Sequence, residues 1–204
     1  MRLQARWDMV LQWASDFAVA EAMLAAKYNK PEFTVIDHYT YGLTSDGDLM
    51  EGVASEAASL AGTLGLGKLI YLYDDNKITI EGSTDIAFTE DVEARFKAYG
   101  WQVLRVADSE DIEAMEAAVK EAQADTEHPS LIIVRTHIGY GSPKQDSASC
   151  HGEPLGAEAL ALTKEKAGWP VGQPFYVPLT VSQYFKNKIE DCEGDQKSLG
   201  SIDG

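Results

Sequence analysis

The sequence is poor in basic residues and cysteine, and it contains no long apolar run. Of its 204 residues, 17 are Lys or Arg and 33 are Asp or Glu, which gives a formal net charge of −16. Nucleic acid and anionic membrane surfaces attract basic patches, so neither is an expected partner. No apolar run approaches the roughly 20 residues that span a bilayer. The first residues also show no apolar stretch or cleavage site typical of a signal peptide.

Cysteine is scarce: the sequence has two, Cys150 and Cys192, far apart in the chain. A disulfide framework would need more cysteines and a secretory signal. We therefore expect free thiols and a cytoplasmic location.

The excess of acidic residues also constrains any anionic ligand. A phosphate-bearing ligand would be repelled by the global field of this chain. It would need a metal ion or a local cluster of backbone N–H groups to bind.

The apolar fraction of 45% suits a globular protein with a real core. Short β-branched or apolar segments alternate with longer segments of helical periodicity, and Pro or Gly punctuates several of the boundaries. The pattern predicts helices at 7–28, 51–64, 89–99, 109–124 and 157–167, with Ser109 as an N-cap, and strands at 35–44, 69–73, 101–106 and 130–136.

This alternation is typical of βαβ units, so we predict an α/β fold with a parallel sheet and helices on both faces. From about Glu190 the sequence is polar and contains glycines, and we expect a frayed tail there. The length suits one domain with appendages.

Two of the predicted strands are followed by residues that could bind a metal ion. Asp46 follows the strand at 35–44, and Asp75 and Asn76 follow the next strand. Ligands of parallel α/β sheets bind beyond the carboxyl ends of the strands. A carboxylate, a carboxamide oxygen and a backbone carbonyl make a partial shell for a hard cation, and the helix after Gly47 favours a diphosphate. Taken alone, these residues fit ordinary turns better than a metal site.

Longer stretches of the sequence carry a more specific signal. The chain resembles transketolase from about Ala20 to Pro178, and the likeness implies a thiamine-diphosphate-binding fold. The segments that carry it are DHYTY at 37–41, SDGDLMEG at 45–52, EAASLAG at 56–62, LGKLIYLYDDNKITIEG at 66–82, AYGW at 98–101, IGYGSP at 138–143 and HGEPLG at 151–156.

The resemblance implies roles for particular residues. Asp46 and Asn76 would be side-chain ligands of Mg²⁺ or Ca²⁺, and Ile78 would offer its backbone carbonyl to the same ion. Gly47 would let the backbone approach the diphosphate of the cofactor. His151 matches a histidine in the loop that lines the substrate channel, although a lone loop histidine can also have no function.

Other matched residues have weaker implications. Asp37, His38 and Tyr41 lie in the strand that leads into the motif, and we expect them to serve sheet packing and edge polarity. Glu51 and Glu56 match positions near the dimer interface of the family, and either would equally suit an exposed helix acid.

The sequence departs from the family pattern at several points. Ser45 stands where the family usually has a glycine, and serine tolerates positive φ poorly, so we expect a shifted turn. Ala148 occupies the position of a second loop histidine. The early histidine- and glycine-rich loops of the family have no counterpart, since Ala5 to Val10 stands where the last of them would fall. The glutamate that activates the cofactor belongs to a different domain in the family, and no residue here can be assigned to it.

We therefore expect an N-terminal helical segment (1–30) in place of the early loops, a cofactor and metal domain (31–178), and a C-terminal helix with a flexible tail (179–204). The implied activity is transfer of a two-carbon ketol unit from a ketose phosphate to an aldose, by a truncated form or subunit. The alternative is a non-catalytic cofactor-binding or assembly module. A calcium loop at 46–51 fits poorly, because its acids lack EF-hand spacing. The expected partners are sugar phosphates and a second copy or a subunit carrying the remaining domains.

Overall fold

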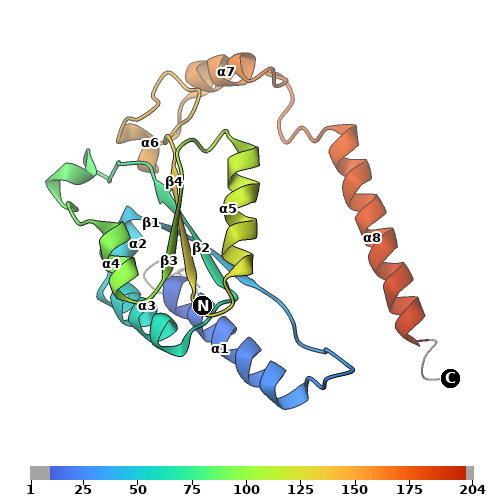
Figure 1. Ribbon diagram of the computed structural model, residues 1–204. Helices are drawn as coiled ribbons and strands as arrows, with labels where there is room; N and C mark the ends of the chain where they lie inside the picture. Colours follow the sequence, from blue (N-terminus) through green and yellow to red (C-terminus); the bar gives the residue numbers. More distant parts are fainter. Residues whose placement is uncertain (1–9, 201–204) are drawn as a thin grey trace, which may run out of the picture. The chain divides into compact units, whose positions relative to one another are not determined.

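The computed structural model describes residues 10–200, with side chains described for residues 11–192. The first three residues of the predicted helix at 7–28, most of the segment at 5–10 and the last four residues of the tail lie outside these ranges. The chain divides into two compact units, one ending at Leu155 and one beginning at Gly156 (Figure 1).

The first unit is built on one sheet. Its four strands are β1 (Thr40–Ser45), β2 (Leu69–Asp75), β3 (Gln102–Val106) and β4 (Ser130–Arg135). Their order is β1-β2-β4-β3, and every pairing is parallel. The predicted parallel α/β architecture is confirmed.

Helices cover both faces of this sheet (Figure 1). One core cluster joins Tyr71, Tyr73 and Leu131 to α1 (Val10–Tyr28), α3 (Gly52–Leu64) and α4 (Val92–Ala98). A second cluster joins Ile70 and Ile132 to α5 (Ile112–Ala124). Strand β4 lies between two neighbours and is buried on both faces, which explains its continuous apolar run.

Small residues set the distance between α3 and the structure around it. The buried residues of α3 are all alanines, with Ala58 and Ala61 fully inaccessible. The carbonyl of Ala58 accepts a 2.8 Å hydrogen bond from the indole of Trp101. Gly65 ends the helix with φ of 60°, a conformation that favours glycine.

Several predicted boundaries were wrong, among them the start of the helix predicted at 89–99, which begins at Val92 after the N-cap Asp91. Strand β1 begins at Thr40 rather than Val35, because the side chain of Asn29 accepts from the amides of Val35 and Ile36 and donates to the carbonyl of Ile36. These backbone groups are therefore not available to a neighbouring strand. Helix α5 begins at Ile112, because Asp111 rather than Ser109 accepts from the amide of Ala114.

Shorter elements complete the first unit: α2 (Asp46–Leu49), a 3₁₀ turn η2 (Thr84–Ile86) and α6 (Ser149–Gly152). The second unit contains α7 (Ala157–Lys166) and α8 (Leu179–Gly200). The expected fraying from Glu190 was wrong up to Gly200, since Glu, Gln and Lys in that stretch favour helix. No helix among the described residues combines the length and apolarity that a membrane crossing requires.

Candidate functional site

The candidate site lies where β1 and β2 end. The two strands are paired in parallel with Ser45 opposite Asp74, the last strand residue of β1 and the penultimate one of β2. Asp46 begins α2 directly after β1, and Asn76 directly follows β2. The carboxyl ends of neighbouring strands thus bring the two predicted metal ligands to one edge of the sheet.

Ser45 fits this turn without adopting a positive φ. Its φ is −133°, which is extended backbone that serine adopts without strain. The backbone amide and the hydroxyl of Ser45 both donate to Oδ2 of Asp48, at 2.8 and 2.9 Å. The turn is closed by this reciprocal capping instead of by a positive φ.

Asp46 is a buried carboxylate with one unsatisfied oxygen. Its side chain is 3% exposed, and Oδ1 accepts a hydrogen bond from the hydroxyl of Tyr73. Oδ2 has no hydrogen-bond partner among the described residues. Burial raises the pKa of Asp46, the bond from Tyr73 opposes this rise, and the charge of Asp75 adds to it. An ionised carboxylate in this position calls for a cation.

A second buried carboxylate lies beside the first. Asp75 is 6% exposed, and its Oδ1 lies 2.6 Å from the ammonium of Lys77. The guanidinium of Arg135 donates to the backbone carbonyl of Asp75 at 2.8 Å. Lys77 is therefore ion-paired with Asp75, and its positive charge acts on Asp46 only through space.

A cavity of about 100 Å³ adjoins these side chains. Acidic residues outnumber basic ones around it, so its electrostatic potential favours cations. Its charged lining residues are Asp46, Asp75, Glu90, Asp91, Glu93, Lys77 and Arg105.

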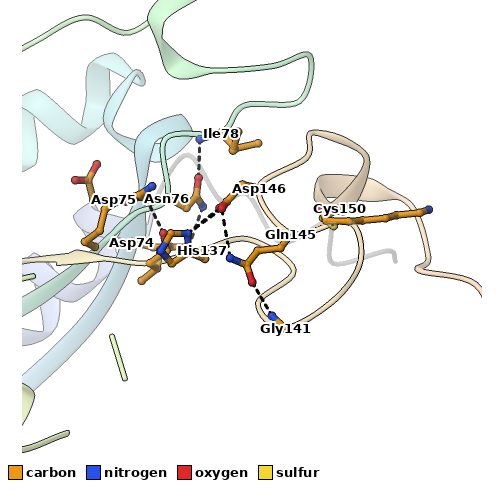
Figure 2. Close-up of polar contacts among 12 residues, drawn as sticks. Asp74, Asp75, Asn76, Ile78, His137, Gly141, Gln145, Asp146 and Cys150 are labelled. Carbon is orange, nitrogen blue, oxygen red and sulfur yellow. Dashed lines mark hydrogen bonds and ion pairs between the residues drawn. The ribbon is translucent and has the colours of Figure 1, made fainter. Parts of the chain in front are cut away.

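The loop after β2 holds Asn76 and Ile78 in a fixed relation (Figure 2). The Ile78 amide donates to Oδ1 of Asn76 at 2.8 Å, and Nδ2 of Asn76 donates to Asp74 at 3.2 Å. Lys77, between the two, adopts a left-handed φ of 64°. A carboxamide oxygen has two lone pairs, so Oδ1 of Asn76 can still take a further partner.

The two predicted side-chain ligands are fixed by different neighbours. Asp46 contacts Tyr73, whereas Asn76 contacts Asp74 and Ile78, and no hydrogen bond joins Asp46 to Asn76 among the described residues. Nor do any three His, Cys, Asp or Glu side chains in that part of the chain form a group that could hold a metal. Any metal site here therefore depends on the Asn76 carboxamide and a backbone carbonyl.

His151 lies on the short helix α6, where its side chain is exposed. Ala148, at the position of the family's second histidine, is the residue preceding this helix. Both cysteines are free, and the Sγ of Cys150 donates to the carbonyl of Lys144 at 3.1 Å within the same loop.

A pair that the sequence analysis missed orders the first part of this loop. The Nδ1 of His137, just beyond β4, lies 2.9 Å from Oδ2 of Asp146, and Figure 2 places this pair near Asn76. The amide of Asp146 also donates to the carbonyl of Ile138 at 2.9 Å. His137 and Asp146 are nine positions apart, and no local sequence pattern predicts that they would pair.

The structure also places the remaining matched residues. Gly47 lies in α2, and a Cβ built on it meets no atom within 4 Å. Asp37 forms a 2.7 Å ion pair with Lys68, and the hydroxyl of Tyr41 accepts from Gln123 at 2.6 Å. The side chains of His38, Glu51 and Glu56 are exposed.

Two of these observations fit a diphosphate cofactor with a divalent cation. The free Oδ2 of Asp46 is a buried ligand atom without a partner. The open space at Gly47 means that the packing of this chain does not itself require glycine there, so a glycine would serve close approach by another group.

Known proteins identify the family of this chain. The family described as "Transketolase, thiamine diphosphate binding domain" matches residues 10–200. The chain is 52% identical over 177 residues to a transketolase of Streptococcus pyogenes, covering 87% of this chain and 24% of that protein. It is 55% identical over 179 residues to a transketolase of Nostoc sp., covering 87% of this chain and 27% of that protein.

Solved structures of transketolases have the same fold as this chain. A transketolase mutant of Pichia stipitis in complex with fructose-6-phosphate superimposes with a TM-score of 0.89 at 44% identity, over 94% of this chain and 28% of that one. Transketolase from Campylobacter jejuni gives a TM-score of 0.80 at 35% identity, over 93% of this chain and 29% of that one. The chain thus spans about a quarter of the length of these relatives. It belongs to the transketolase family and corresponds to part of the thiamine diphosphate-binding domain.

Proposed function

We propose that the chain binds thiamine diphosphate through a divalent cation, Mg²⁺ or Ca²⁺. The side chains of Asp46 and Asn76 and the backbone carbonyl of Ile78 would hold the ion. The observation that carries this proposal is the buried Oδ2 of Asp46, which has no partner among the described residues. A hard cation takes oxygen ligands of these kinds, and diphosphate oxygens and waters would complete its shell.

The charge of the chain supports a role for the cation. At a net charge of −16, a diphosphate would approach Asp46 and Asp75 against strong repulsion. A divalent ion between the carboxylate and the diphosphate turns this repulsion into attraction. Gly47 would leave room for the diphosphate beside the first turn of α2.

The activity we propose for the complete assembly is transfer of a two-carbon ketol unit from a ketose phosphate to an aldose. When bound, the cofactor supplies a nucleophilic carbon for this transfer. The residues of this chain would bind and orient the diphosphate, and His151 would contact the sugar from its loop. A second copy, or a subunit with the remaining transketolase parts, would complete the site.

Calorimetry with thiamine diphosphate and Mg²⁺ tests the binding site. We expect binding that disappears in excess chelator. Asp46→Ala should abolish it, and Asn76→Ala should weaken it less because a neutral ligand is lost. Asp85→Ala, which removes an exposed acid on η2, is the matched control and should bind like the parent. Equal binding of thiamine diphosphate by the parent and all three variants would show that the site has been misplaced.

A second candidate function is a non-catalytic cofactor-binding or assembly module. The chain spans 24–28% of the length of the curated relatives that it matches, so their whole activity does not transfer to it directly. An assay with hydroxypyruvate and a short aldehyde discriminates between the two. We expect little turnover by the 204-residue chain alone and restored turnover when the remaining part of a related transketolase is added. Failure of restoration, with cofactor binding intact, would favour the module.

A further inference from the structure

Tyr73 lies in an environment that fixes its ring. It is on β2, its side chain is 2% exposed, and it belongs to the core cluster that α1, α3 and α4 cover. Closely packed side chains in a core keep one rotamer on average. The position of the Tyr73 hydroxyl is therefore determined by the sheet and its helices.

That hydroxyl reaches past the end of the neighbouring strand. Tyr73 is paired with Thr44 in the sheet register, and its hydroxyl donates to Oδ1 of Asp46, two residues further along the chain. A tyrosine hydroxyl keeps its proton at neutral pH, and a carboxylate oxygen can only accept, so Tyr73 is the donor of this bond.

The contact makes the two oxygens of Asp46 unequal. Oδ1 is occupied by Tyr73, whereas Oδ2 is buried without a partner among the residues described. The nearby ammonium of Lys77 is paired with Asp75 at 2.6 Å. The hydrogen bond therefore leaves one defined oxygen of Asp46 for a ligand from outside the chain.

We infer that Tyr73 is a positioning residue, whose hydroxyl holds the Asp46 carboxylate so that Oδ2 faces a divalent cation. This inference rests on the proposed cofactor site and adds a residue that contacts neither cation nor cofactor. Ligating carboxylates in metalloproteins are themselves hydrogen-bonded, and loss of such a partner typically weakens metal binding about 10- to 100-fold.

The test measures Mn²⁺ affinity by electron paramagnetic resonance, on the full chain with thiamine diphosphate at fixed concentration. Tyr73→Phe keeps the ring and removes only the donor, and we expect about 10- to 100-fold weaker Mn²⁺ binding. The control is Tyr39→Phe. It removes a hydroxyl that donates to the carbonyl of Gln123 at 3.2 Å, near the opposite end of β1, and it should bind Mn²⁺ like the parent.

Thermal unfolding separates positioning from a purely structural role. Positioning predicts that Mn²⁺ with thiamine diphosphate raises the Tm of Tyr73→Phe less than that of the parent. If the role of Tyr73 were purely structural, Tyr73→Phe would lower the Tm by the same amount with and without Mn²⁺ and thiamine diphosphate. Replacement of Tyr73 by 4-aminophenylalanine puts an N–H donor back at the same place and should restore Mn²⁺ affinity. It also provides a folded variant if Tyr73→Phe does not fold.

The outcomes distinguish this inference from the proposed function. If Asp46→Asn loses Mn²⁺ and Tyr73→Phe binds it like the parent, the role of Tyr73 is overturned and the site stands. If the parent itself binds no Mn²⁺ in the presence of thiamine diphosphate, the site and the inference both fail.

Discussion

The ammonium of Lys77 lies 2.6 Å from Oδ1 of Asp75, and this ion pair joins a left-handed loop residue to the buried end of β2. The Lys77 side chain is 56% exposed and that of Asp75 only 8%. Lys77 thus pairs with one of two adjacent buried carboxylates, and Asp46, the other, is the proposed cation ligand.

Removing this ammonium should destabilise the fold. Lys77→Met keeps the length of the side chain but leaves Asp75 without its charge partner, near Asp46. We expect a loss of ~1–2 kcal/mol in the free energy of unfolding, less than for a fully buried pair because Lys77 is half exposed. Urea denaturation measures it. The control Lys120→Met breaks an exposed pair with Glu116 and should have a smaller effect; equal losses would contradict the special role of Lys77.

Gly47 and Gly52 form a matched pair for testing the approach of the diphosphate. A Cβ at either position meets no atom within 4 Å. Both lie in helices, so Ala at either position should leave the fold intact and even stabilise it by ~0.5–1 kcal/mol. Only Gly47→Ala should weaken thiamine diphosphate binding, by at least about tenfold. Calorimetry on both variants checks this, and parental affinity in Gly47→Ala would show that the diphosphate lies elsewhere.

Gly62 is required by packing instead of by a ligand. A Cβ on Gly62 would lie 1.8 Å from the backbone carbonyl oxygen of Tyr99, which cannot move as a side-chain tip can. Gly62→Ala should therefore destabilise the chain by ~3 kcal/mol or more. Thermal or urea unfolding measures the loss, with Gly52→Ala as the reference. A stable Gly62→Ala variant would mean that α3 and the residues after α4 are less closely packed.

The pair His137–Asp146 predicts a pH dependence of the loop after β4. The hydrogen bond from His137 lowers the pKa of Asp146 below its ordinary 3.8. A carboxyl with a depressed pKa stabilises the folded loop above its ordinary value, and this contribution is lost as the pH falls through the lower, folded value. A ¹³C NMR titration of the carboxyl carbons measures this pKa directly.

In His137→Asn the pKa of Asp146 should move back up towards 3.8. His128→Asn is the control, because His128 pairs with Asp125 in another loop and should leave Asp146 unchanged. An unaltered Asp146 titration in His137→Asn would refute the assignment of His137 as the cause.

Much of the fold could be predicted from the sequence, because its signals are local. The apolar run at 131–134 indicates a strand buried on both faces, and β4 lies between two neighbours. Gly65 and the alternation of strands with helices indicate where α3 ends and that the sheet is parallel. The resemblance to transketolase rests on contiguous motifs, so the family was also determined by the sequence alone.

At two places a side chain a few residues away, and not the propensity of the residues themselves, decided the backbone conformation. Residues 35–39 have the composition of a strand, yet Asn29 takes the backbone groups of Val35 and Ile36. Ser45 replaces the expected glycine without strain, because Asp48 caps it in an extended conformation. Neither outcome follows from the propensity of the residues concerned.

The sequence by itself predicted the residues of the candidate site: Asp46, Gly47, Asn76 and Ile78 stand in contiguous motifs beyond two strands. Only the tertiary structure decided how those residues are held. Tyr73 and Asp46 are 27 positions apart, and His137 and Asp146 are nine apart. The physical reason is that a hydrogen bond depends on distances of about 3 Å between atoms, and parallel strand pairing and loop folding set such distances between residues remote in the chain.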